Sequence, residues 1–83
     1  MSHVVVLYAK AGCHLCDEAR AYLDDALAEL DRDLDLRELD IRRDDEIFER
    51  YRYRIPVIAV DGVERLEGRI EASAVWELLR SLP

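Results

Sequence analysis

The sequence has few cysteines, few glycines and prolines, and no long hydrophobic run. Its two cysteines are separated by only two residues, so a bond between them closes a very short loop and adds little stability. The apolar run at residues 4–9 is too short for a membrane span or a secretion signal, and the residues before it lack basic charge. We therefore expect no membrane contact, a cytoplasmic location, and cysteines that serve chemistry rather than architecture.

Basic residues are also in the minority, with 12 Lys and Arg against 19 Asp and Glu and a formal net charge of -7. Such an acidic chain is a poor partner for nucleic acid. Arginines do cluster between residues 42 and 54, but interleaved acidic residues indicate a solvated surface. The chain of 83 residues is long enough for one domain, residues 1–83, which we expect to be a monomer.

Hydrophobic periodicity predicts seven secondary-structure elements. Continuous β-branched runs indicate strands covered on both faces, and apolar residues at intervals of three and four indicate helices. Asp44 is a suitable N-cap for a short helix that continues to Tyr51, and Asp61-Gly62 is a strong signal for a hairpin turn. We expect strands at residues 4–8, 34–41, 55–60 and 63–66, and the longer helices at residues 14–30 and 71–82.

The element order is therefore strand, helix, strand, helix, strand, strand, helix. Strands separated by helices imply parallel crossovers, and the hairpin adds an antiparallel strand at the edge. This order predicts an α/β fold with a mixed four-stranded sheet and helices on both of its faces.

The two cysteines lie where the first predicted strand turns into the first helix, in the stretch Cys-His-Leu-Cys at residues 13–16. That place directs both sulfurs at the free N–H groups and the positive end of the helix dipole, which favours thiolate over thiol. Cys13, at the helix cap, is the expected attacking thiol, and such a position can bring a cysteine pKa down to roughly 3.5–7.5. Cys16 lies one turn later, at a Cα–Cα distance of about 5–6 Å that suits a disulfide, and is the expected resolving thiol.

Neighbouring residues are candidates for tuning the pKa of the attacking thiol. His14 can carry positive charge or donate a hydrogen bond, and Lys10 stands three residues before Cys13. Asp17 and Glu18 act against the effect of His14 and Lys10, because negative charge disfavours a nearby thiolate. The alternative for His14 and Lys10 is an ordinary exposed position without a chemical role.

Residues 8–16, 55–57 and 61–62 together resemble the corresponding stretches of glutaredoxins. More narrowly, the chain is similar in element order, over nearly its whole length, to short bacterial glutaredoxin-like proteins of the thioredoxin superfamily. The resemblance implies a thioredoxin-like fold of the glutaredoxin type, β-α-β-α-β-β-α. It also implies a cis peptide bond between Ile55 and Pro56 beside the cysteines, where the Ile55 backbone pairs with a peptide substrate.

The chain also departs from that family. His14 and Leu15 replace the usual proline and aromatic residue between the cysteines, and the usual Gly-Gly pair before the last helix is replaced by Gly68-Arg69. The resemblance implies glutathione as a co-substrate and no other cofactor. The substrate or glutathione site that it implies consists of Lys10, Ile55, Pro56, Gly68 and Arg69.

The motif and the resemblance together predict a thiol–disulfide oxidoreductase that reduces disulfides in proteins or small molecules through Cys13 and Cys16. Glutathione or a thioredoxin-reductase-type flavoenzyme is the expected reductant, and no metal is expected. One alternative is a carrier that binds a metal or an iron–sulfur cluster through the same two cysteines, although two thiolates supply only half of a tetrahedral ligand set. Another is an interaction module with idle cysteines.

Overall fold

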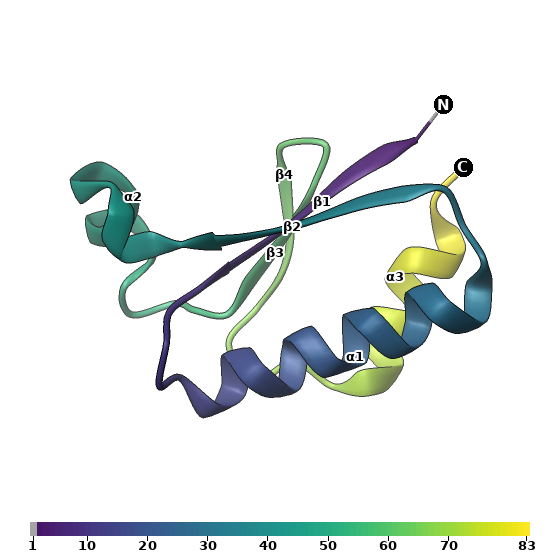
Figure 1. Ribbon diagram of the computed structural model, residues 1–83, viewed down its shortest axis with the longest axis horizontal. Coiled ribbons are helices and arrows are strands. Elements are labelled where there is room, and N and C mark those ends of the chain that lie inside the picture. The colour runs from purple at the N-terminus through teal and green to yellow at the C-terminus, as the bar shows by residue number, and fades with distance from the viewer. Residues whose placement is uncertain (1) are drawn as a thin grey trace.

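A computed structural model describes residues 2–83, and the seven predicted elements are all present in it (Figure 1). The strands are β1 (His3–Ala9), β2 (Leu34–Asp40), β3 (Val57–Val60) and β4 (Val63–Glu67). The helices are α1 (His14–Leu30), α2 (Asp45–Tyr51) and α3 (Ala72–Ser81), with a 3-10 turn, η1 (Ile41–Arg43), between β2 and α2.

The four strands form one mixed sheet, as predicted, and their order in it is β2-β1-β3-β4. β1 pairs in parallel with β2, as expected for strands joined through a helix. β3 pairs antiparallel with both β1 and β4, so the parallel crossover expected between the second and third strands is wrong. The β3–β4 hairpin turns at Asp61 and Gly62, whose φ angles of 51° and 85° are both positive. A two-residue turn with two positive φ angles matches the twist of the flanking strands, which confirms the predicted hairpin.

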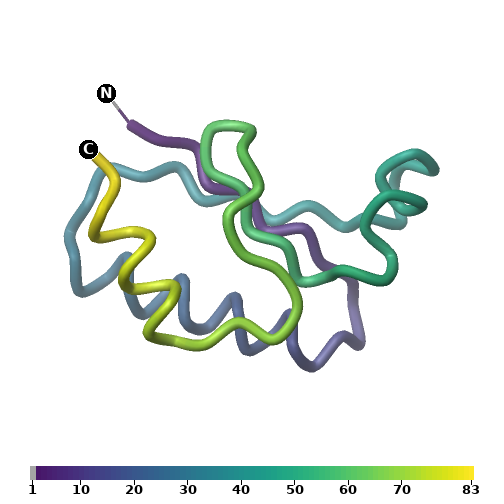
Figure 2. The backbone as a smooth tube through the Cα atoms, turned by 180° about the vertical axis from the view of Figure 1, so that it is seen from behind, coloured from purple at the N-terminus to yellow at the C-terminus, as the bar shows by residue number. Residues whose placement is uncertain are grey.

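Helices cover both faces of the sheet, but unequally. Figures 1 and 2 show α1 and α3 side by side along one face, where Leu23 and Leu79 pack with Leu7 in the main core. On the other face, α2 covers only the end of the sheet, where Tyr51 packs against Val57. The prediction that the first strand is covered on both faces is therefore confirmed only in part: the side chains at residues 4 and 6 stay half-exposed.

Capping residues mark the start of α2 and the end of α1. Asp44 accepts hydrogen bonds from the backbone N–H groups of Glu46 and Ile47 at 2.9 and 3.0 Å, which confirms it as the N-cap of α2. α1 ends at Leu30, and the C-cap residue that follows, Asp31, has a left-handed conformation (φ 48°). Every helix among residues 2–83 is too short or too polar to cross a bilayer.

Candidate active site

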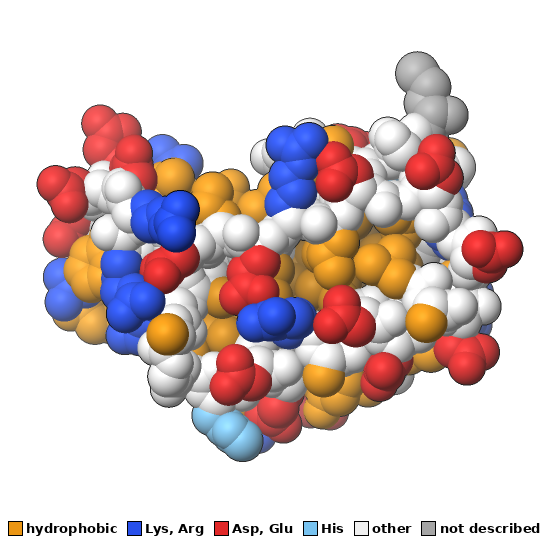
Figure 3. Space-filling view, in the orientation of Figure 1, with side chains coloured by type: hydrophobic (Ala, Val, Ile, Leu, Met, Phe, Trp, Pro, Cys, Tyr) orange, Lys and Arg blue, Asp and Glu red, His pale blue; other side chains and the backbone are white. Residues whose placement is uncertain are grey.

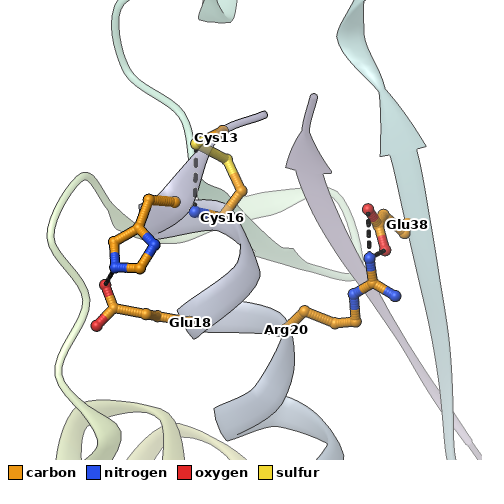
Figure 4. Close-up of a disulfide and its surroundings, with 6 residues drawn as sticks. Cys13, Cys16, Glu18, Arg20 and Glu38 are labelled. Carbon is orange, nitrogen blue, oxygen red and sulfur yellow. Dashed lines mark hydrogen bonds and ion pairs between the residues drawn. A yellow bond between two sulfur atoms is a disulfide. The ribbon is translucent and has the colours of Figure 1, made fainter. Parts of the chain in front are cut away.

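Cys13 and Cys16 form a disulfide at the N-terminus of α1 (Figure 4). Their Cα atoms are 5.2 Å apart, within the range that a disulfide requires. Cys16 is 2% exposed and belongs to the main core, whereas Cys13 is half-buried and packs at its margin. The two sulfurs thus differ in their access to solvent, and Cys13 is the more accessible of the pair.

The local backbone explains how Cys13 comes to cap the helix. Gly12 has a φ of 82°, a conformation that glycine adopts without strain, and it lets the chain turn sharply between β1 and α1. The N–H of Cys13 then donates to the carbonyl of Lys10 at 3.3 Å, and Cys13 itself keeps an extended conformation typical of an N-cap. The turn thereby places the Cys13 side chain over the first turn of α1.

The Sγ atom of Cys13 accepts a hydrogen bond from the backbone N–H of Cys16 at 3.2 Å (Figure 4). This N–H is one of the donors that a helix leaves unpaired at its N-terminus. In the reduced form, the same donor and the helix dipole stabilise negative charge on the Cys13 sulfur. The site therefore has the geometry that thiol–disulfide exchange needs: an accessible sulfur that accepts a hydrogen bond from a helix N–H, and a second sulfur within bonding distance.

The two predicted tuning residues lie close to the disulfide in the chain but face solvent. The His14 side chain is 88% exposed, and its Nε2 lies 3.8 Å from a carboxylate oxygen of Glu18. Lys10 is exposed, and its backbone carbonyl, rather than its ammonium group, makes the contact that fixes Cys13. Asp17 is exposed in the first turn of α1.

The segment between α2 and β3 lies near the start of α1, since its Ile55 packs against the same core cluster as Cys13 (Figure 1). The Ile55–Pro56 peptide bond in this segment is cis, as the resemblance implied. Ile55 packs against the core that contains Cys16. The N–H of Ile55 donates to the carbonyl of Tyr51 at 3.1 Å, so a substrate strand can pair with this N–H only after that bond opens.

Gly68, the residue that follows β4, joins this arrangement. Its N–H donates to the carbonyl of Pro56 at 2.9 Å and lies 3.2 Å from the carbonyl of Arg54, so the structure brings the predicted residues Gly68, Ile55 and Pro56 together. The next residue, Arg69, is exposed. The neighbouring Glu67 carboxylate is bound by the Arg54 guanidinium at 2.8 Å, so its charge is already offset beside Arg69.

A network around Arg54 was not predicted from the sequence. The guanidinium of Arg54 binds the carboxylates of Glu64 and Glu67 and lies over the ring of Tyr51, 5.2 Å from its centroid. The Tyr51 hydroxyl donates to Glu64 at 2.8 Å, and burial, followed by this hydrogen bond, raises the pKa of Tyr51 to about 12. The Tyr51 ring also stacks on Tyr8, with centroids 4.2 Å apart.

The Arg54 network ties the segment before Pro56 to β4 and to the sheet. The sequence signal for it is the arginine two residues before the proline together with the two glutamates of β4, but only the strand register shows that these residues meet. Arg54 also holds the pKa of Glu64 and of Glu67 below their ordinary values, chiefly through its hydrogen bonds.

Within residues 2–83, no cluster of three or more His, Cys, Asp or Glu side chains is arranged to hold a metal ion. The candidate donors for a metal or cluster thus remain the two cysteine sulfurs, half of a tetrahedral set.

A family profile described as the glutaredoxin-like domain (DUF836) matches residues 4–80. Among solved structures, target protein XcR50 from X. campestris is similar, with 26% sequence identity and a TM-score of 0.76 over 95% of this chain and 99% of that chain. A thioredoxin point mutant from Halobacterium salinarum superposes with a TM-score of 0.67 at 21% identity, over 95% of this chain and 73% of that chain.

An oxidised thioredoxin from Plasmodium falciparum superposes with a TM-score of 0.68 at 16% identity, over 94% of this chain and 78% of that chain. At such low identity the two thioredoxins show a shared fold. The family match spans nearly the whole chain, residues 4–80 of 83. The chain therefore belongs to the glutaredoxin-like domain family and has a thioredoxin-like fold.

Proposed function

We propose that the protein is a thiol–disulfide oxidoreductase in which Cys13 is the nucleophile and Cys16 the resolving thiol. The observation that carries this proposal is the disulfide at the N-terminus of α1. Its Cys13 sulfur accepts a hydrogen bond from a helix N–H, and Cys16 is buried. The family match and the thioredoxin fold support the same kind of chemistry.

In the proposed reaction the reduced protein transfers two electrons to a substrate disulfide. The Cys13 thiolate attacks one substrate sulfur, a mixed disulfide forms, and the other substrate sulfur leaves as a thiolate that takes up a proton. Cys16 then loses its proton and attacks the Cys13 sulfur. The second substrate thiol leaves, and the disulfide seen in the structure forms.

The residues around the disulfide have supporting roles in this proposal. Lys10 supplies positive charge near the developing thiolate, and His14 supplies positive charge or a hydrogen bond. The surface formed by Ile55 and Gly68, beneath which Pro56 is buried, receives the substrate, whose carboxylate groups Arg69 attracts. The substrates are disulfide-bearing proteins or small molecules in the cytoplasm.

The reductant that restores the dithiol is glutathione, as a co-substrate, or a thioredoxin-reductase-type flavoenzyme. Offering the oxidised protein each reductant in a separate reaction distinguishes the two. The exposed Arg69 and Lys10 favour glutathione, which is anionic, and the variants Arg69→Ala and Lys10→Ala should then slow reduction by glutathione more than reduction by dithiothreitol.

The decisive experiment uses Cys13→Ser and Cys16→Ser with a small aliphatic disulfide as substrate. We expect Cys13→Ser to abolish turnover, because the nucleophile is gone. Cys16→Ser should retain the first step and accumulate a mixed disulfide on Cys13, seen by mass spectrometry under non-reducing conditions. Full turnover by Cys13→Ser would overturn the proposal, as would a mixed disulfide that forms on Cys16 in that variant at the rate of the native protein.

A further inference from the structure

β2 is an edge strand of the sheet, and its outer side carries no protective irregularity. It pairs with β1 through seven consecutive residues in unbroken register. The opposite edge, β4, is shorter and has a bulge in its pairing with β3. Bulges and short strands discourage further pairing, so β2 is the edge that remains open to another strand.

Figure 3 looks onto this edge, and backbone atoms of the region are open to solvent there. Beside them, between β2 and α1, hydrophobic side chains form the floor of a hollow of about 210 Å³. Leu7 and Leu36 provide the apolar lining, and Arg20, Asp24 and Glu38 form the rim.

Charge along the edge is arranged in a way that suits a second copy in the antiparallel direction. Within β2, Asp35 lies one position before Leu36 and Arg37 lies one position after it. An antiparallel copy can bring Asp35 of each strand beside Arg37 of the other, whereas a parallel copy in the same register sets like charges together. We propose that β2 pairs antiparallel with β2 of a second copy, which forms a continuous eight-stranded sheet.

The side chains of β2 also select one register. With a two-fold axis at Leu36, Asp35 of each copy lies opposite Arg37 of the other, which gives two such pairs. Leu36 of one copy then lies opposite Leu36 of the other. Axes at residues 35, 37 or 38 would set two aspartates, two arginines or two glutamates opposite each other, and directly opposed like charges destabilise a sheet. Within one chain Asp35 and Arg37 already form an exposed ion pair at 2.7 Å, which these side chains exchange for the pairs between copies.

Two charged residues of β2, Glu38 and Asp40, lie on the α1 side of the sheet, and Asp40, at the end of the strand, is paired with Arg42 at 2.7 Å. Such inward charges often prevent edge pairing, because association would bury them unpaired. Here the Glu38 carboxylate is bound by Arg20 at 3.0 Å (Figure 4). The charge of Glu38 is therefore offset before the second copy binds. In this register Glu38 lies opposite Leu34 of the second copy.

This association is separate from the proposed redox function and does not depend on it. It predicts that the protein is a dimer at high protein concentration, rather than the monomer expected from the sequence. Sedimentation equilibrium over a range of concentrations measures the mass directly: the native protein should rise from 9.7 kDa toward twice that value. A native protein of monomeric mass at every concentration up to about 1 mM, at which an interaction of −4.1 kcal/mol is half-formed, overturns the proposal.

Charge reversal tests the register. Asp35→Arg and Arg37→Asp each replace two attractive contacts between copies by two repulsive ones, and each should weaken the dimer about tenfold or more. The double variant, Asp35→Arg with Arg37→Asp, restores opposite charges and should restore association. Arg65→Asp, the same charge change on the β4 edge, is the matched control and should leave the dimer unchanged. Single reversals that leave association unchanged, or a double variant that stays monomeric while folded by circular dichroism, overturn the proposal.

Discussion

The imidazole of His3 bridges the two ends of the described chain, with its Nδ1 only 2.6 Å from Oδ2 of Asp61 in the hairpin turn. Its other ring nitrogen lies 2.8 Å from the carbonyl oxygen of Pro83. Both partners are acceptors, and only the protonated imidazolium can donate to both at once. The hydrogen bond to Asp61 accordingly raises the pKa of His3 above its ordinary 6.5.

Stability should therefore depend on pH through this pair. Because the His3 pKa is raised on folding, its contribution is complete below 6.5 and is lost as the pH rises through the raised pKa. The Val4 N–H and His3 lower the pKa of Asp61 below 3.8, so the Asp61 contribution is present above 3.8 and is lost as the pH falls through the lowered pKa. The pair stabilises the fold most between these two values.

The measurement compares melting temperatures of the native protein and His3→Gln at about pH 5.5 and about pH 8.5. The native protein should exceed the variant by more at the lower pH. Asp61→Asn should show the same loss of pH dependence, because it removes the acceptor that favours the charged imidazole. An equal difference between native protein and His3→Gln at both pH values would contradict the role of His3.

Arg32 should be a major stabilising residue although it lies outside the hydrophobic core. Its guanidinium, in the loop between α1 and β2, donates to the carbonyls of Leu79 and Leu82 at 3.1 and 2.6 Å, and so satisfies acceptors that the end of α3 leaves unpaired. Arg32→Met keeps the apolar stem and removes the donors, and it should cost about 1–3 kcal/mol of the free energy of unfolding. Urea unfolding measures this, with Arg80→Met, an exposed arginine on α3, as a control that should change little.

Local signals explain why most of the fold could be predicted from the sequence. α1 begins and ends where its apolar periodicity does, and the N-cap Asp44 lies within a few residues of the groups that it binds. The errors have local causes too. β3 begins at Val57 rather than residue 55, because Pro56 has no N–H to donate to a strand partner. η1 was missed because it depends on the Asp40 side chain, which accepts from the Arg42 N–H, and not on hydrophobic period.

The candidate site could be predicted only as far as its residues are neighbours in the chain. Cys13 and Cys16 are one helical turn apart, so spacing was enough to pair them. The cis bond at Pro56 and the nearness of Gly68 came from a family resemblance, since no local pattern specifies them. The bonds of Arg54 to β4 depend on strand register, which composition and periodicity do not determine.

The Tyr51 hydroxyl should contribute less to stability than the Tyr51 ring does. Tyr51→Phe keeps the stack on Tyr8 and the core packing but removes the hydrogen bond to Glu64, and we expect it to cost about 0.5–1.5 kcal/mol. Tyr51→Ala removes the ring from a site that is 4% exposed and should cost about 3–5 kcal/mol. Tyr53→Phe, at an 86% exposed position, is the matched control and should change nothing measurable. Equal losses for Tyr51→Phe and Tyr51→Ala in urea unfolding would refute this division.

After reduction, Cys13 should react with iodoacetamide before Cys16. Cys13 is half-buried at the helix cap with an N–H aimed at its sulfur, whereas Cys16 is 2% exposed within the core, and alkylation needs a thiolate that the reagent can reach. Brief labelling at neutral pH followed by peptide mapping should find the label on Cys13 in most singly modified molecules. In urea, where the helix and its cap are lost, the two thiols should react at similar rates. Preferential labelling of Cys16 in the folded protein would reverse the assigned roles, and equal labelling would show that the helix end gives Cys13 no advantage.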